Sequence, residues 1–279
     1  MSLLIADSGS TKTDWALISN HSVKQYKTEG LNPYFHSSKS IEKVLKNDLK
    51  PDLEGKNVNH ILFYGSGCDS EPKITSMTNI LKRVFPGAEA SVHEDLLGAA
   101  RACCFDKPGI VCILGTGSNS CRYDGTRIVQ QIPSLGFILG DEGSAGYFGQ
   151  KLINHYYRNE IPSDLARKLE WYYDMDLDSI FDGIYNNDQS SRFVAFYSSF
   201  LGEHNDHHFI REMLCNGFEN FISRIVLQYQ DARSYKVNFI GSLGCAYQAI
   251  LKELLTKHLL TPGVFIKSPM DRLVEFHNQ

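Results

Sequence analysis

Residues 3–19 read LLIADSGSTKTDWALIS, and this stretch sets the expectation for the whole chain. An apolar run ends at Asp7, a turn of small polar residues follows, and a second apolar run begins at Trp15. Because glycine and hydroxyl residues separate two runs of strand composition, we predict a strand, a tight turn and a second strand. On this stretch alone, a β-hairpin with an ordinary polar turn is an equally good interpretation.

The functional interpretation of this turn is a phosphate-binding loop. Backbone N–H groups around Gly9 would point into one concavity, and such a concavity suits phosphate oxygens. The side chains that would add to it are the Lys12 ammonium and the hydroxyls of Ser8, Ser10, Thr11 and Thr13. Asp7, at the end of the first strand, is placed to hold a magnesium ion directly or through water.

Residues 110–123, IVCILGTGSNSCRY, have the same design. An apolar strand leads into a turn that contains Gly115, Thr116, Gly117 and Ser118, and a second strand follows. Two such hairpins about a hundred residues apart predict two similar half-molecules that face each other across a cleft and hold a nucleotide. Neither loop is a P-loop, and the second lacks the third glycine and the following helix of a dinucleotide-binding turn.

Composition limits the class of protein. At 279 residues, with 42% hydrophobic and 22% charged residues, the chain has room for two soluble domains. A net charge of −4 argues against a nucleic-acid surface. We see no signal peptide and no apolar segment of membrane-spanning length, so we expect a cytoplasmic protein. The seven cysteines are scattered, which argues against a disulfide framework or a zinc site.

Further loops follow the other predicted strands. The strand at 58–64 ends in Gly65-Ser66-Gly67-Cys68-Asp69, and ligands gather at such strand ends in α/β sheets. Asp95 opens a helix, where a carboxylate can simply cap free N–H groups. If the preceding strand joins the sheet of the first hairpin, however, Asp95 lies near the same cleft.

The second half repeats this order. A strand at 127–132 precedes PSLGFILGDEGSAGYFG (133–149), whose dense glycines favour a binding loop around Asp141 before a helix at 144–157. We then expect a long helix at 209–229, after a solvated loop that contains three histidines. A strand at 236–240 should end in the turn Gly241-Ser242. The remaining expected elements are helices at 41–49, 74–85, 246–258 and 270–277 and a strand at 264–267.

Taken together, these motifs resemble the actin/Hsp70/sugar-kinase superfamily, and within it the N-acetylglucosamine kinase group of the BadF/BadG/BcrA/BcrD-type ATPase family. The matching pieces are DSGSTKTD, GSGCDS, EDLLGAARA, LGTGSNS, LGFILGDEGSAGYFG and FIGSLG, in family order over most of the chain. The resemblance implies an α/β fold with two ribonuclease-H-like (actin-like ATPase) lobes. The N-terminal lobe would be residues 1–106, joined by the C-terminal helix at 269–279, and the second lobe residues 107–268.

The resemblance also implies roles for particular residues. Asp95 would be the general base, and Asp7 would serve Mg²⁺. ATP would be bound by Ser8, Gly9, Ser10, Thr11, Lys12, Gly115, Thr116, Gly117 and Ser118, with Gly241 and Ser242 at the base or ribose. A sugar would be bound by Asn32, Asp69, Thr116, Ser134, Gly136, Asp141 and Ala145. Leu135-Gly136 replaces the tryptophan-glycine of the family, so contacts to the N-acetyl group would differ.

The expected activity is therefore ATP-dependent phosphorylation of the 6-hydroxyl of N-acetylglucosamine or a close amino sugar. N-acetylmuramic acid, glucosamine and glucose are the alternative substrates. Two other classes stay open: an ATPase that activates a radical enzyme, and a sugar-sensing protein without catalysis. Small-molecule sugar and ATP are the expected partners, with no nucleic acid or membrane, and the sequence leaves the oligomeric state, a homodimer included, open.

Overall fold

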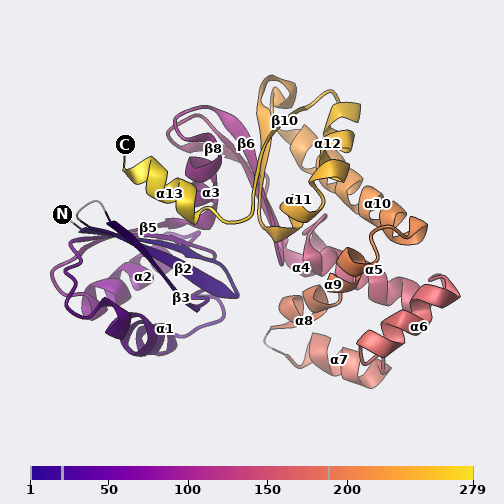
Figure 1. The fold of residues 1–279 in the computed structure, drawn as a ribbon, viewed down its shortest axis with the longest axis horizontal. Coiled ribbons are helices and arrows are strands. Elements are labelled where there is room, and N and C mark those ends of the chain that lie inside the picture. Colours follow the sequence, from indigo (N-terminus) through magenta and orange to yellow (C-terminus); the bar gives the residue numbers. More distant parts are fainter. Residues whose placement is uncertain (1, 20–21, 188, 279) are drawn as a thin grey trace. The chain divides into compact units, whose positions relative to one another are not determined.

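The structure is a computed structural model that describes residues 2–19, 22–187 and 189–278. The chain forms two compact units, described here separately. Unit 1 contains residues 1–107, 125–127 and 268–279, and unit 2 contains residues 108–124 and 128–267. Both units are α/β, each with one five-stranded mixed sheet flanked by helices (Figure 1).

The sheet of unit 1 has the strand order β3-β2-β1-β4-β5. The hairpin predicted from residues 3–19 is confirmed, and its two strands pair antiparallel from Ser2↔Ser19 to Ser8↔Thr13. The third strand also pairs antiparallel, while β4 and β5 run parallel to β1. The strands are β1 (Ser2–Ser8), β2 (Lys12–Ser19), β3 (Ser22–Glu29), β4 (His60–Gly65) and β5 (Glu89–Glu94).

Alternation along the strands of unit 1 divides its buried side chains between two helical layers. Leu4, Trp15 and Phe63 point to the layer of α1 (Ser38–Val44) and α2 (Glu71–Val84), where they form the main apolar core. The other face is covered by α3 (Asp95–Cys104) and the C-terminal α13 (Met270–His277) (Figure 1). Both ends of the chain therefore contribute to unit 1.

The sheet of unit 2 repeats this topology, with the order β8-β7-β6-β9-β10. The hairpin of β6 and β7 corresponds to that of β1 and β2, and β9 and β10 again run parallel to the first strand. The strands are β6 (Gly109–Leu114), β7 (Ser118–Tyr123), β8 (Ile128–Gln131), β9 (Lys236–Ile240) and β10 (Thr261–Ile266). Two similar halves, as predicted from the two hairpins, are thus present.

Unit 2 carries most of the helices. Its core packs α5, α10 and α12 against the sheet through buried residues such as Phe148, Phe218 and Leu251. The helices are α4 (Gly136–Leu139), α5 (Ala145–Tyr157), α6 (Ser163–Tyr172), α7 (Leu177–Tyr185), α8 (Ser190–Phe196), α9 (Ser199–Glu203), α10 (His208–Arg224), α11 (Ser242–Ala246) and α12 (Gln248–Lys257).

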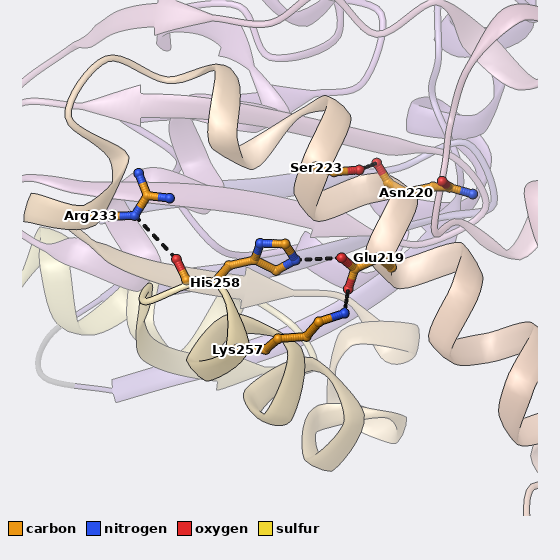
Figure 2. A network of polar contacts seen from close by, with 6 residues as sticks. All are labelled: Glu219, Asn220, Ser223, Arg233, Lys257 and His258. Carbon is orange, nitrogen blue, oxygen red and sulfur yellow. Dashed lines mark hydrogen bonds and ion pairs between the residues drawn. The ribbon is translucent and has the colours of Figure 1, made fainter.

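A polar network ties α10 to the end of α12. The carboxylate of Glu219 accepts a hydrogen bond from Lys257 Nζ at 3.4 Å and contacts His258 Nε2 at 2.6 Å (Figure 2). Arg233 Nε donates to the His258 carbonyl at 3.3 Å. These bonds fix the C-terminal turn of α12 directly before β10 begins.

Three predicted helices differ from those observed. The helix expected at 209–229 ends at Arg224, because Tyr229 turns inward and its hydroxyl contacts Ser120 Oγ of β7 at 2.6 Å. The helix expected at 246–258 is α12, which begins two residues later at Gln248, and the short helix α11 precedes it where only a turn was expected. The segment at 41–49 continues α1 as a π-helix from Leu45. Among the residues described, no helix has the length and apolar character needed to cross a membrane.

The burial of α13 generates a prediction about stability. Leu273 is fully buried, whereas Glu275 on the same helix is exposed. We expect Leu273→Ala to lower the free energy of unfolding by about 2–5 kcal/mol, because it leaves a cavity where α13 packs on the sheet. Urea denaturation followed by circular dichroism measures the change. Glu275→Ala is the control, and equal midpoints for the two variants would contradict the docking of α13.

Candidate functional site

A row of polar side chains crosses the sheet of unit 1 near the carboxyl end of β1. Asp7 pairs with Asp14 of β2 and with Tyr64 of β4, and Tyr64 pairs with His93 of β5. Directly paired residues on neighbouring strands point to the same face of a sheet. These four side chains therefore lie on the face covered by α3 and α13.

The turn after β1 has the compact form that the sequence predicts. Gly9 N–H donates to the Lys12 carbonyl at 3.0 Å, and Gly30 N–H donates to the Thr11 carbonyl at 3.1 Å. A Cβ at Gly30 would lie 2.5 Å from the Gly9 carbonyl oxygen, so only glycine allows this close packing. Gly30 thus supports the turn from behind, while Ser10 and Thr11 are exposed at its tip.

Two of the predicted phosphate ligands, Ser8 and Lys12, already bind other side chains or backbone groups of the protein. Ser8 Oγ is buried, contacts Thr13 Oγ1 at 2.8 Å and accepts a hydrogen bond from Leu31 N at 3.1 Å. Lys12 Nζ forms an ion pair with Asp14 Oδ2 at 2.5 Å. Ser8 therefore has a structural role in the turn, and Lys12 would have to exchange Asp14 for a phosphate oxygen.

Asp7 and Asp95 have unusual electrostatics. Burial and, to a lesser extent, the negative charges of Asp95 and Asp14 raise the pKa of Asp7 to about 7, against a smaller opposing effect of Lys12. Burial also raises the pKa of Asp95 to about 7, with Glu94 and Asp69 adding to the shift. The two carboxyl groups thus lie in one half-buried, negative region of unit 1.

Asn32 and Asp69 belong to the same region. Asn32 is buried; its side chain donates to Ser66 Oγ at 3.3 Å and accepts from Tyr34 N at 2.9 Å. The Tyr34 hydroxyl donates to Asp69 Oδ1 at 3.0 Å, and the charge of Asp69 acts on Asp95. Of the predicted sugar ligands in unit 1, Asp69 therefore lies near the predicted general base, and Tyr34 links it to Asn32.

In unit 2, the turn between β6 and β7 joins the start of α5. Gly115 N–H donates to the Gly117 carbonyl at 3.0 Å, which closes the turn. Ala145 N–H donates to Gly115 and Gly146 N–H to Thr116, both at 2.9 Å. The second predicted phosphate loop is thereby fixed against the predicted sugar-binding residue Ala145.

Asp141 lies beside this loop. It is buried at a φ of 55°, and Ser134 Oγ donates to its Oδ1 at 3.0 Å. A Cβ at Gly117 would lie 2.6 Å from Asp141 Oδ2, so glycine allows the carboxylate to approach the loop. Burial raises the pKa of Asp141, while hydrogen bonds from Ser134 and the Ser118 backbone lower it.

A cavity of about 360 Å³ opens next to Asp141 within unit 2. Leu135 and Leu139 contribute apolar lining, and Glu142 pairs there with Arg224 at 3.3 Å. Gly136 is exposed at a φ of 71° at the start of α4. The polar residues lining the cavity include Ser118, Asn119, Ser134 and Asp141.

The turn after β9 also lies next to the loop after β6. Gly241 has a φ of 115°, and a Cβ there would lie 2.3 Å from the Leu114 carbonyl oxygen. Ser242 begins α11 directly afterwards. Unit 2 thus brings the predicted nucleotide turn to the second phosphate loop.

The donor set near Asp7 fits Mg²⁺, because carboxylate oxygens are the side-chain ligands that this ion prefers. Within the described residues, no three acidic, histidine or cysteine side chains form a group that could hold a metal alone. Mg²⁺ characteristically keeps several waters and binds through one or two carboxylates and substrate phosphates. Asp7 therefore fits as a single protein contact to a nucleotide-bound ion.

The sequence reasoning missed Asp14, Tyr64 and Ser66. Asp14 could have been found from the hairpin register, since a four-residue turn after Ser8 pairs residue 7 with residue 14.

The histidine-rich loop is a loop before a helix, as expected, and His207 Nδ1 accepts a hydrogen bond from Phe209 N at 3.1 Å to cap α10.

Comparison with known proteins places the chain in a family. No protein-family model matches the sequence, and no curated protein matches it. A solved structure, the presumed N-acetylglucosamine kinase of Porphyromonas gingivalis, is 35% identical with a TM-score of 0.94, over 99% of this chain and 98% of that one.

More distant structures share the fold. A ROK family glucokinase from Streptomyces griseus, in complex with glucose and AMPPNP, is 15% identical with a TM-score of 0.57, over 100% of this chain and 98% of that one. MreB 5 of Spiroplasma citri, bound to AMPPNP, is 11% identical with a TM-score of 0.61, over 99% of this chain and 95% of that one. The chain therefore belongs to the family of the presumed N-acetylglucosamine kinase of P. gingivalis, and its two units have the actin-like ATPase fold.

Proposed function

We propose that the chain is an ATP-dependent sugar kinase that phosphorylates the 6-hydroxyl of N-acetylglucosamine or a close amino sugar. The observation that carries this proposal is Asp95, a half-buried carboxyl group at the start of α3, whose pKa is raised to about 7 by burial and by the charges of Glu94 and Asp69. A general base works best when its pKa lies near the operating pH. The membership of the chain in a kinase family supports the same assignment.

In the proposed reaction, Asp95 accepts the proton of the sugar 6-hydroxyl as that oxygen attacks the γ-phosphorus of ATP. The bond from this phosphorus to the β,γ-bridging oxygen breaks, and ADP leaves. We propose that Asn32, Asp69 and Asp141 bind the other sugar hydroxyls. In phosphoryl transfer the protein contributes mainly position and charge, which is what such a set of polar side chains supplies.

The nucleotide is proposed to use both glycine-hydroxyl turns. Ser10, Thr11 and Lys12 of the first turn and Gly115, Thr116 and Gly117 of the second would bind phosphate oxygens, with Gly241 and Ser242 at the base or ribose. Backbone N–H groups in tight turns suit anionic oxygens. Asp7 would hold Mg²⁺ through oxygen, and the bound ion would neutralise charge on the phosphates.

The proposal is tested by a coupled ADP-release screen of the purified protein over amino sugars and hexoses. We expect N-acetylglucosamine to give the highest kcat/KM, ahead of N-acetylmuramic acid, glucosamine and glucose. Mass spectrometry of the product identifies the phosphorylated hydroxyl. ADP release that no sugar stimulates would reject the kinase assignment.

Replacing the proposed base separates chemistry from binding. We expect Asp95→Asn to lower kcat about 10²–10⁴-fold, the usual contribution of a general base, because an amide cannot accept the proton. ATP binding, measured by calorimetry, should stay near the wild-type value. Turnover close to that of the wild type would remove Asp95 from this role.

The same variant gives a prediction for stability against pH. The folded-state pKa of Asp95 is raised to about 7 from an ordinary value of 3.8. The contribution of this proton to stability is complete below about pH 4 and is lost as the pH rises to about 7. The side chain in Asp95→Asn does not ionise, so this variant does not lose that stability. Its melting temperature, measured in EDTA, should therefore rise relative to that of the wild type between pH 4 and pH 7. A difference that does not change with pH would contradict the raised pKa.

A further inference from the structure

Tyr64 is the largest polar side chain in the row across the sheet of unit 1, and it is fully buried. It lies between Asp7 and His93 in the strand register, one residue before Gly65, which ends β4. None of the roles proposed above uses it. Its surroundings nevertheless connect it to the helix that carries Asp95.

The ring of Tyr64 supports α3 directly. A Cβ on Gly98 would lie 2.8 Å from Tyr64 Cγ, so the helix approaches the ring as closely as glycine allows. Gly98 stands three residues after Asp95, which is about one helical turn. The position of this ring therefore sets the distance of the first turn of α3 from the sheet.

The hydroxyl of Tyr64 makes two hydrogen bonds. Arg101 Nη1 of α3 donates to it at 2.6 Å, and His277 Nε2 of α13 lies 2.9 Å away. Burial lowers the pKa of His277 to about 4, helped by the charge of Arg101, so this ring is neutral near pH 7. The neutral Nε2 accepts a hydrogen bond from the phenolic O–H, and the phenolic oxygen accepts one from Arg101.

Arg101 depends strongly on this arrangement. Its guanidinium lies over the rings of Tyr64 and Phe276, at 5.8 and 5.5 Å from the ring centroids. Among the described residues, no hydrogen-bond partner meets its buried Nε. A half-buried guanidinium whose Nε has no partner in the described part of the chain loses stabilisation when the phenolic oxygen is removed. The phenol thus links three elements, β4, α3 and α13.

We propose that Tyr64 is a positioning residue: it fixes the distance of α3 from the sheet, and thereby the position of the Asp95 carboxyl group for proton transfer. His277 of α13 supports Tyr64 in this role through its hydrogen bond to the phenol. The inference rests on the proposed function, because it assigns the role through Asp95. Small displacements of a reacting group cost large factors in rate, about 10²-fold for 1 Å, so such support has a measurable effect on catalysis.

The test compares Tyr64→Phe with a matched tyrosine. Tyr64→Phe keeps the ring against Gly98 and removes only the hydroxyl. Tyr26→Phe is the control, because the Tyr26 hydroxyl of β3 has no hydrogen-bond partner among the described residues and its ring packs against the other core of unit 1. His277→Ala is a second variant that leaves Tyr64 in place.

We expect Tyr64→Phe to lower kcat about tenfold while the KM values for sugar and ATP change by less than about twofold. Hydrogen–deuterium exchange should become faster in the peptide covering residues 95–104. His277→Ala should shift both measurements in the same direction, and Tyr26→Phe neither. If Tyr64→Phe does not fold, His277→Ala decides the result alone.

Two results would overturn the proposal. One is a Tyr64→Phe variant with the kcat and α3 exchange of Tyr26→Phe. The other is a fall in kcat that only follows a general loss of folded protein, with both KM values rising as well. If the wild type phosphorylates no sugar, the proposed function fails, and exchange in α3 still decides whether Tyr64 holds this helix.

Discussion

The burial of two carboxyl groups in unit 1 is the constraint on which the proposed chemistry depends. Asp7 and Asp95 both have a pKa raised to about 7, and other negative side chains add to the cost of ionising them. The lysine that counteracts this effect at Asp7 is paired with Asp14. Ionising these groups at neutral pH therefore lowers the stability of unit 1, and the site favours a bound proton or cation. Such a loss of stability is typical of functional sites.

The repeated topology explains how one fold supplies two kinds of site. The turn after β1 corresponds to the turn after β6, and both are glycine-hydroxyl loops. The turn after β4 corresponds to the turn after β9, yet Gly65 leads towards Asp69 and Gly241 towards α11. In unit 1 the turn after β4 leads to the proposed sugar ligand Asp69, and in unit 2 the turn after β9 contains the proposed nucleotide contacts. The shared topology places the loops at equivalent positions, and their side chains distinguish the proposed roles.

Short-range sequence patterns predicted the local structure, but they did not predict contacts between residues that are far apart in the sequence. Both hairpins follow from glycine and hydroxyl residues between apolar runs, and Asp95 begins α3 as expected. The end of α10 could not be foreseen, because it depends on a contact from Tyr229 to Ser120, 109 residues earlier. The helices between residues 158 and 208 were not assigned from the sequence. The bond between Tyr64 and His277 spans 213 residues, and no periodicity in the sequence indicates it.

The participation of both chain ends in unit 1 has a consequence for synthesis on the ribosome. Strands β1 to β5 emerge early, but α13, which covers one face of their sheet together with α3, is translated only after unit 2. The nascent first half therefore cannot complete its fold, and part of its apolar surface stays exposed, until all of unit 2 has been translated. Unit 2 is free of this delay, because its own strands and helices are complete before α13 is made. A premature stop just before residue 268 would thus release a finished second half attached to an unfinished first one.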